Sequence, residues 1–397
     1  MTGKNLVKLY EKLFSNLEEP LALLENLDVK NNMTNSLVIY RKYRPQVFAE
    51  VVGQEHLVKT LTYAISKGRP AHAYLLSGTR GVGKTTVARL IAKALNCTDI
   101  QNKYEPCNKC KTCIAISQNS LVDLLELDAA SHRGIDEAKS LIESVKYPPV
   151  SAKYKVFIID EVHMLTREAF NSLLKTLEEP PEYAVFILAT TEPQKIPQTI
   201  ISRCQYFELK RLTTEEIIEK VKRILTSEKI KMDSRSIKFI ARGGRGSLRD
   251  TESLLEQIIS QSKKEIVWSD LEEILGIVSP EATRNYLSMI FKKDTKKALN
   301  FIREIFERGK DMSQFNLQIV DYLRLIVLGR IDKSLLDIHN LEGSEKEDIV
   351  ELGKLIQEKK ALALIDVFSK ANRDLGQYPS TDMSTELATI GAVEVLK

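Results

Sequence analysis

The sequence predicts a parallel α/β domain, followed by smaller parts built from helices. A glycine-rich loop lies between a short apolar segment and an Ala- and Leu-rich helical segment. A second apolar run, Val156–Ile159, ends in two acidic residues. Further apolar segments at Leu121–Leu127, Ala184–Ala189 and Tyr206–Leu209 alternate with helical patterns, and beyond the last of them helical patterns dominate. Strands that alternate with helices are typical of a parallel sheet.

Length and composition are those of a globular protein with two or three domains. The chain has 397 residues, of which 43% are hydrophobic and 28% charged, and its formal net charge is +4. This small excess of positive charge permits contact with nucleic acid but does not argue for it. The sequence contains no apolar run of membrane-spanning length and no secretory leader, so we expect a cytoplasmic location and no membrane partner. An N-terminal extension, residues 1–36, has helical spacing of Leu and Phe and no assigned role.

The glycine-rich loop is the strongest local signal. The pattern G-x-x-x-x-G-K-[ST] begins at Gly78 and ends at Thr85, and its glycines allow backbone N–H groups to face a phosphate. The helix that follows directs its N-terminal dipole at the same anion. We expect Lys84 to reach the β- and γ-phosphates of ATP and the Thr85 hydroxyl to ligate Mg²⁺. The candidate ATP-binding residues of this loop are Gly78, Thr79, Gly81, Val82, Gly83, Lys84, Thr85 and Thr86.

Two carboxylates follow the second apolar strand. Asp160 and Glu161 come directly after Val156–Ile159, at the carboxyl edge where ligands bind in open α/β sheets. We expect Asp160 to hold the shell of the Mg²⁺ ion and Glu161 to polarise the attacking water. Such a pair alone can also be a solvated strand end, but the phosphate loop favours the catalytic interpretation.

Four of the five cysteines lie close together between the first helix and the second strand. The four are Cys97, Cys107, Cys110 and Cys113. Four thiolates suit a closed tetrahedral Zn²⁺ site with a structural role. An iron–sulfur cluster and free thiols are the alternatives, although the ferredoxin spacing continues to a further cysteine that this segment lacks. Cys204 lies far away in the sequence and is interpreted as a buried apolar residue.

Several separated segments carry a family resemblance. They are Tyr40–Gln54, Gly78–Thr86, the cysteine insertion, Glu126–Ser131, Ile159–Met164, Phe170–Pro181, Leu188–Pro193, Ser202–Cys204 and Gly246–Asp250. In this order they resemble the gamma/tau subunits of bacterial DNA polymerase III, which are clamp-loader ATPases of the AAA+ class. The resemblance implies a P-loop AAA+ domain at 37–211 with a zinc insertion at 97–120, a helical lid at 212–277 and an all-helical collar for oligomerisation at 278–397.

The resemblance also implies roles for individual residues. Thr191 is similar to the sensor that reads the γ-phosphate, with Thr190 as the alternative. Arg203 is similar to the arginine finger that acts on ATP bound by the neighbouring subunit, and Arg249 to the second sensor, on the lid. For each arginine the alternative is a surface ion pair. The residues that the resemblance places around adenine are Tyr43, Arg44, Val51 and Val52, and those it places near DNA are Ser131 and Arg133.

The family implies a motor subunit that uses ATP to open a sliding clamp and load it onto primer–template DNA, without polymerising DNA itself. The implied partners are delta-type and delta-prime-type subunits, further copies of the chain in a pentamer, the clamp and the DNA. Because no tau-like tail is visible, the chain resembles the shorter gamma form. A helicase-type translocase is one alternative, since Asp160 to His163 fits a D-E-x-H box, but it would need a second α/β domain. A scaffold that binds nucleotide without hydrolysis is the other, and the intact Lys84 and Glu161 argue against it.

Overall fold

The computed structural model describes residues 38–131, 135–261, 264–339, 341 and 343–397. The predicted extension at residues 1–36 and the predicted DNA contact Arg133 lie outside the described residues. The described chain forms two compact units. The first runs to Ile224 and includes Ile240–Glu256, and the second comprises Leu225–Phe239 and Gln257–Lys397.

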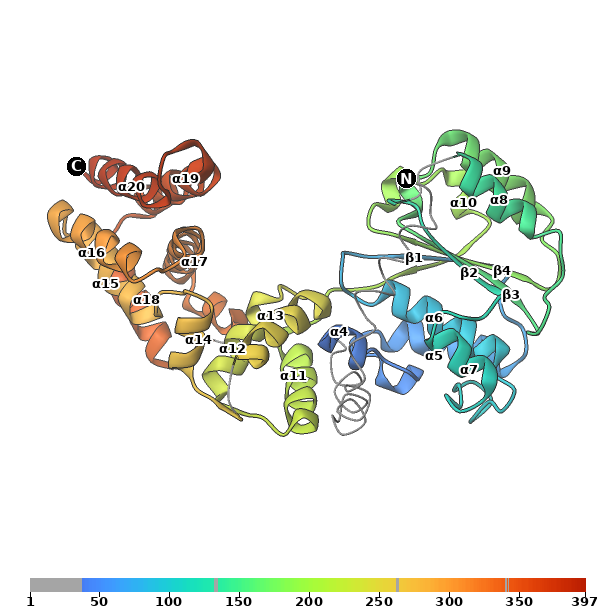
Figure 1. Cartoon of the computed structure of the whole chain (residues 1–397). Helices are drawn as coiled ribbons and strands as arrows, with labels where there is room; N and C mark the ends of the chain where they lie inside the picture. Colours follow the sequence, from blue (N-terminus) through green and yellow to red (C-terminus); the bar gives the residue numbers. More distant parts are fainter. Residues whose placement is uncertain (1–37, 132–134, 262–263, 340, 342) are drawn as a thin grey trace, which may run out of the picture. The chain divides into compact units, whose positions relative to one another are not determined.

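A five-stranded parallel sheet forms the centre of the first unit (Figure 1). Its strands are β1 (Ala73–Ser77), β2 (Leu124–Asp128), β3 (Lys155–Asp160), β4 (Ala184–Thr190) and β5 (Gln205–Glu208). The strand order is β2-β3-β4-β1-β5, so β2 and β5 are the edge strands. Strands β1 and β4 are buried along their whole lengths, as expected for a sheet covered on both faces. The predicted parallel α/β fold is confirmed.

Helices cover both faces of this sheet (Figure 1). One face carries α5 (Glu55–Ser66), α6 (Lys84–Asn96) and α7 (Lys111–Ser117), and the other carries α8 (Ile135–Ser144), α9 (Arg167–Glu178) and α10 (Gln198–Ile201). Side chains alternate along β1, so Tyr74 and Leu76 join the core on the first face and Ala73 and Leu75 join the core on the second. Short helices are α4 (Ile39–Lys42) and the 3₁₀ turns η1 (Phe48–Glu50), η2 (Val162–Met164) and η3 (Pro193–Lys195).

Helices follow the last strand of the sheet, as the sequence predicts. They are α11 (Thr214–Glu228), α12 (Ser234–Gly243), α13 (Leu248–Gln261) and α14 (Trp268–Ile274). A short parallel pairing joins β6 (Lys231–Met232) to β7 (Glu265–Ile266). The sequence pattern does not predict this pairing, because two residues are too few for a strand periodicity to be visible.

The rest of the second unit is helical. Its elements are α15 (Pro280–Phe291), α16 (Thr295–Glu307), α17 (Met312–Ile331), η4 (Lys333–His339), α18 (Gly343–Lys354), α19 (Glu358–Asp374), η5 (Leu375–Gln377) and α20 (Thr381–Leu396). Tyr286, Phe315 and Phe368 are fully buried in its core, and the Tyr286 hydroxyl lies 2.6 Å from that of Thr389. The helical C-terminal part is therefore confirmed. Among the described helices, none has the length and apolarity that a membrane crossing requires.

A buried carboxylate, Asp123, organises the loop that leads into β3. Its side chain accepts hydrogen bonds from the backbone N–H groups of Val150, Ser151 and Ala152 at 2.7, 2.7 and 2.8 Å. Burial by itself raises the pKa of this carboxyl group, but these hydrogen bonds to the charged form outweigh burial, and the pKa of Asp123 lies below its usual value of 3.8. Ionised Asp123 therefore stabilises the fold.

Asp123→Asn is expected to lower the free energy of unfolding around β2 and β3 by about 2 kcal/mol at pH 7, because a neutral amide replaces a charged hydrogen-bond acceptor. A carboxyl group whose pKa falls on folding contributes its full stability above the unfolded pKa, and loses it as the pH falls through the folded pKa. The difference in the free energy of unfolding between wild type and variant should therefore be largest at pH 7 and should decrease below about pH 4. Hydrogen exchange of the β3 amides at each pH measures it, with the exposed Asp99→Asn as control. A difference that does not change with pH would contradict the assignment.

Candidate nucleotide and metal sites

The loop between β1 and α6 has the backbone conformation that encloses a phosphate. Gly78, Gly81 and Gly83 have φ angles of 148°, 81° and 105°, which residues with a Cβ atom rarely adopt. Helix α6 begins at Lys84, directly after Gly83, so its unpaired N–H groups face the loop. The strand and the helix that the motif requires are thus both present. Of the other predicted loop residues, Val82 is buried, Thr86 is half-buried and Thr79 is exposed.

Gly81 lies in close contact with the start of α13. The Leu248 N–H donates a hydrogen bond to the Gly81 carbonyl at 3.1 Å. A Cβ atom at position 81 would lie 1.9 Å from Ser247 Oγ and 3.3 Å from the Cβ atom of Arg249. The lid helix therefore begins on the phosphate loop itself, and glycine is required at this position by contact as well as by conformation.

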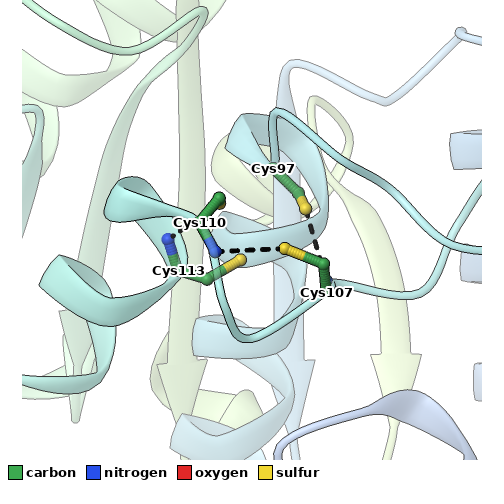
Figure 2. A group of neighbouring side chains, drawn as sticks. All are labelled: Cys97, Cys107, Cys110 and Cys113. Atoms are coloured by element: carbon green, nitrogen blue, oxygen red, sulfur yellow. Dashed lines mark hydrogen bonds between the residues drawn. The ribbon is translucent and has the colours of Figure 1, made fainter.

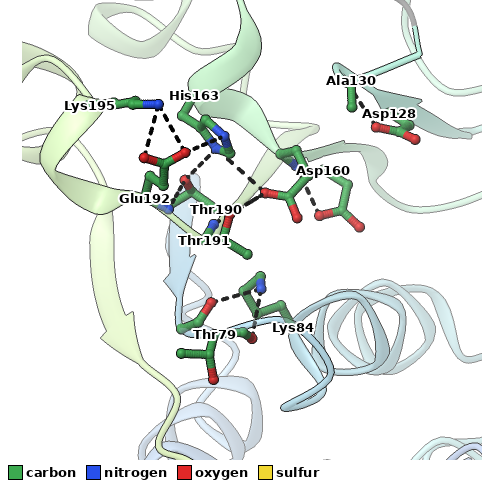
Figure 3. A network of polar contacts seen from close by, with 12 residues as sticks. Thr79, Lys84, Asp128, Ala130, Asp160, His163, Thr190, Thr191, Glu192 and Lys195 are labelled. Atoms are coloured by element: carbon green, nitrogen blue, oxygen red, sulfur yellow. Dashed lines mark hydrogen bonds and ion pairs between the residues drawn. The ribbon is translucent and has the colours of Figure 1, made fainter. Parts of the chain in front are cut away.

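Lys84, Thr85 and the carboxylates at the end of β3 converge beside the loop, and Figure 3 shows Lys84 and Asp160. The Lys84 ammonium donates to two carbonyl oxygens of the loop at 2.8 and 3.1 Å. The pKa of Lys84 lies below its usual value, because the effect of burial outweighs the opposite effect of the negative charges of Glu161 and Asp160. The Thr85 hydroxyl donates to Asp160 Oδ2 at 2.7 Å. Two motifs that are distant in sequence thus form one site.

Glu161 is held at the end of β3 in a left-handed backbone conformation, with φ 47° and ψ 45°. This conformation costs a non-glycine residue on the order of 1 kcal/mol. Thr191 fixes the Glu161 carboxylate, because its hydroxyl and its N–H donate to Oε2 at 2.9 and 3.2 Å. A carboxylate oriented in this way can position a water molecule and accept its proton.

His163 and Glu192, which the sequence patterns did not indicate as site residues, extend this network (Figure 3). His163 Nδ1 lies 3.0 Å from Thr190 Oγ1 and 3.5 Å from Glu161 Oε2, and its Nε2 lies 3.3 Å from Glu192. The buried Thr190 therefore contacts His163, whereas Thr191 contacts Glu161. Their positions could have indicated them, because His163 lies two residues after the predicted site residue Glu161 and Glu192 lies one residue after the predicted site residue Thr191.

The predicted adenine-side residues lie on the segment before α5. The Tyr43 carbonyl accepts a hydrogen bond from Lys220 Nζ at 2.9 Å. Burial lowers the pKa of Arg44. Val51 packs against the core that also contains the loop residue Val82, and Val52 is half-buried beside it.

The two predicted arginines have different surroundings. Arg249 lies at the start of α13, next to the phosphate loop, with its guanidinium 5.3 Å from the centre of the Tyr40 ring. Arg203 donates instead to Glu178, the last residue of α9, at 2.6 Å and to the Thr199 carbonyl on α10 at 2.8 Å. Within one chain Arg203 thus forms the surface ion pair that was the alternative, and its hydrogen bonds in the described structure do not reach the phosphate loop.

The four predicted metal ligands converge at the end of α6 (Figure 2). The sulfur atoms of Cys97, Cys107, Cys110 and Cys113 all lie within 4.8 Å of one another. This separation fits a tetrahedral ion with metal–sulfur bonds of about 2.3 Å. Burial raises the pKa of Cys110, but hydrogen bonds from the Cys113 and Thr98 amides outweigh it and lower that pKa to about 6. Cys204 lies apart from the cluster and is only half-buried, packed against the core, where burial raises the pKa of its thiol to about 12.

Comparison with known proteins identifies the family. The chain is 41% identical to DNA polymerase III subunit tau of Bacillus subtilis, over 85% of this chain and 60% of that protein. It is 36% identical to DNA polymerase III subunit gamma of Buchnera aphidicola subsp. Schizaphis graminum, over 91% of this chain and 99% of that protein. The chain belongs to the gamma/tau family of DNA polymerase III clamp-loader subunits. The predicted family resemblance is thus confirmed.

Matches to family models divide the gamma/tau-type chain into three parts. They are a DNA polymerase III delta subunit model at residues 53–213, a clamp-loader ATPase lid domain at 216–264, and gamma and tau domain III at 267–396. The chain spans about half the length of several tau relatives, for example 46% of the tau subunit of Escherichia coli, with 42% identity. Among solved structures, the clamp loader delta protein of Bacillus subtilis matches with a TM-score of 0.38 and 12% identity, over 85% of this chain and 99% of that one.

Gly81→Ala is expected to weaken nucleotide binding by about 10-fold or more, because the new methyl group would overlap Ser247 and force a left-handed alanine. Gly68→Ala is the matched control, since Gly68 also has a positive φ but a methyl group there would meet no atom of the described chain within 4 Å. Titration with a fluorescent ATP analogue measures both affinities. Equal affinity of Gly81→Ala and wild type would contradict a rigid contact between loop and lid.

Proposed function

We propose that the chain is the ATP-hydrolysing motor subunit of a clamp loader, which opens a sliding clamp and places it on primer–template DNA. The observation that carries this proposal is the convergence of Lys84, Asp160 and Glu161 at one edge of the sheet, in a member of the gamma/tau family. A scaffold that only bound nucleotide would not need a carboxylate held in place by Thr191. The arrangement therefore favours hydrolysis.

The proposed chemistry is divided among the residues at this edge. Lys84 and the loop amides bind the β- and γ-phosphates, and Thr85 and Asp160 hold a Mg²⁺ ion that offsets phosphate charge. Glu161 polarises the water that attacks the γ-phosphorus. Thr191 keeps Glu161 oriented and senses the phosphate.

The remaining predicted residues fit the same proposal. Arg249 contacts the nucleotide of its own chain from the lid, and Arg203 acts on the nucleotide of a neighbouring subunit. Adenine is enclosed by Tyr43, Arg44, Val51 and Val52. We propose the division into an AAA+ domain (37–211), a lid (212–277) and a collar (278–397). The family-model matches at 216–264 and 267–396 support separate lid and collar parts, and the second match begins within the proposed lid.

The cysteine cluster is proposed to hold one structural Zn²⁺ ion, since four protein ligands leave no coordination position for water. The proposed partners are delta-type and delta-prime-type subunits, further copies of the chain in a pentamer, the clamp and primed DNA. The subunit would act at the replisome in the bacterial cytosol. DNA contacts would be mainly to phosphates, because a loader must accept any sequence, and the exposed Ser131 is a candidate.

ATP turnover by the full chain, mixed with the companion loader subunits and the clamp of its host, tests the proposal. Turnover should rise strongly only when the clamp and primed DNA are both present. Stimulation by single-stranded DNA alone would indicate a translocating motor, and no turnover in any mixture would indicate a scaffold. Lys84→Ala provides the background rate, because it removes the phosphate-binding ammonium.

Arg203→Ala should leave ATP affinity nearly unchanged and lower DNA-stimulated turnover by about 10³-fold or more, since arginine fingers contribute roughly 10³ to 10⁵ in rate. Glu178→Gln is the matched control, because it breaks the same ion pair and keeps the guanidinium. Turnover and analogue binding are measured for both variants. If Glu178→Gln reduced turnover as much as Arg203→Ala, the ion pair within the chain, and not a contact to a neighbour, would explain the loss.

A further inference from the structure

The segment at residues 43–52 carries the proposed adenine-side residues and is attached to the four-cysteine module, which we define as residues 97–113. Two residues of the module make this attachment. Glu105 hydrogen-bonds to Phe48 and Ala49, and Asn108 hydrogen-bonds to Gln46. The contacts join parts of the chain that are more than 50 residues apart, so they depend on the tertiary position of the module.

Glu105 is a buried carboxylate with 8% of its surface exposed. Its Oε2 accepts a hydrogen bond from the Phe48 N–H at 2.8 Å, and its Oε1 accepts one from the Ala49 N–H at 3.0 Å. These amides open the 3₁₀ turn η1, where the preceding Val47 offers no side-chain cap. The module thus supplies acceptors that the segment lacks, and hydrogen bonds to a carboxylate are stronger than neutral ones.

Asn108 makes the second attachment. Its side-chain amide donates to the Gln46 carbonyl at 3.0 Å and accepts from Lys93 Nζ at 2.9 Å. The same ammonium donates to the Gln46 side chain at 2.6 Å. Lys93 is buried on α6, the helix that begins at the phosphate-binding Lys84. The module, the segment and α6 therefore share one polar cluster.

The cysteines determine where these two residues lie. Glu105 belongs to the loop between Cys97 and Cys107, and Asn108 lies between Cys107 and Cys110 with a left-handed φ of 57°. Binding of one ion by all four sulfurs closes that loop and reduces the conformations open to it. The metal would therefore favour the positions from which both residues reach the segment.

We propose that Glu105 and Asn108 are positioning residues through which the metal module holds residues 43–52 in the shape that accepts the adenine of ATP. This inference rests on the proposed binding of ATP by the chain. Nucleotide affinity then depends on the metal, although the cysteines are not phosphate ligands. A role confined to the module would stabilise the insertion and leave residues 43–52 unchanged.

The test compares the full wild-type chain with Glu105→Ala and Glu105→Gln, and with Lys109→Ala as an exposed control in the same module. Glu105→Ala should weaken binding of a fluorescent ATP analogue by about 10-fold, because the N–H groups of the buried Phe48 and of Ala49 both lose their charged acceptor. Glu105→Gln, which keeps one acceptor oxygen, should lie between it and wild type. Zinc content should stay at the wild-type level in all variants, and hydrogen exchange of residues 43–52 without nucleotide should rise in both Glu105 variants.

A second test changes no residue: a chelator removes zinc from the wild-type chain. It should raise exchange at residues 43–52 and weaken analogue binding, with the β4 amides as the internal reference. Wild-type affinity in Glu105→Ala together with unchanged exchange at residues 43–52 would overturn the inference. If the wild-type chain bound no analogue, the proposed function would fail, but the exchange data would still test the attachment of residues 43–52 to the module. Unchanged exchange at residues 43–52 after zinc removal would overturn that attachment, and increased exchange would support it.

Discussion

Strands β1, β3 and β4 run parallel and in register, so their carboxyl ends meet at one edge of the sheet. The phosphate loop after β1, the carboxylates at the end of β3 and the threonines at the end of β4 therefore come together without long connections. A one-residue slip of β3 would turn Asp160 to the opposite face. Core side chains prevent such a slip, and the stacked rings of Phe157 and Phe186, whose centroids are 5.0 Å apart, belong to that core. The packing of the sheet interior therefore determines the geometry of the site.

Among the described residues, the lid and the segment before α5, which lie beside this edge, are joined to the domain by individual hydrogen bonds and not by strand pairing. Hydrogen bonds between parts distant in sequence connect Leu248 to Gly81, Lys220 to Tyr43, and Glu256 to the N–H of Ile39. Each such bond contributes about 1 kcal/mol net, far less than the burial of a whole strand. These single hydrogen bonds therefore contribute less to holding the lid and the segment before α5 in place than strand burial contributes to holding the sheet.

Patterns in the sequence predicted the phosphate loop, the Asp160–Glu161 pair and the cysteine cluster from residue spacing, and the parallel fold from the alternation of strands and helices along the chain. The contacts of Gly81 with Ser247, of His163 with Thr190 and of Glu105 with Phe48 could not be predicted in this way. They arise from tertiary packing, in which a side chain of common type gains its role from a partner far along the chain. The β6–β7 pairing was missed because it is shorter than any periodicity.

The four-cysteine module enters the chain just before β2, which is an edge strand, so it can be inserted without disturbing the order β3-β4-β1. Its attachment through Glu105 nevertheless makes the neighbouring segment depend on it. In a lineage that lost the cysteines, the sheet would survive, but the amides of Phe48 and Ala49 would lose a fixed acceptor. Loss of the four cysteines should therefore coincide, over evolutionary time, with replacement of Glu105 and with a new capping residue at position 47. The module and that turn would then be inherited as one unit.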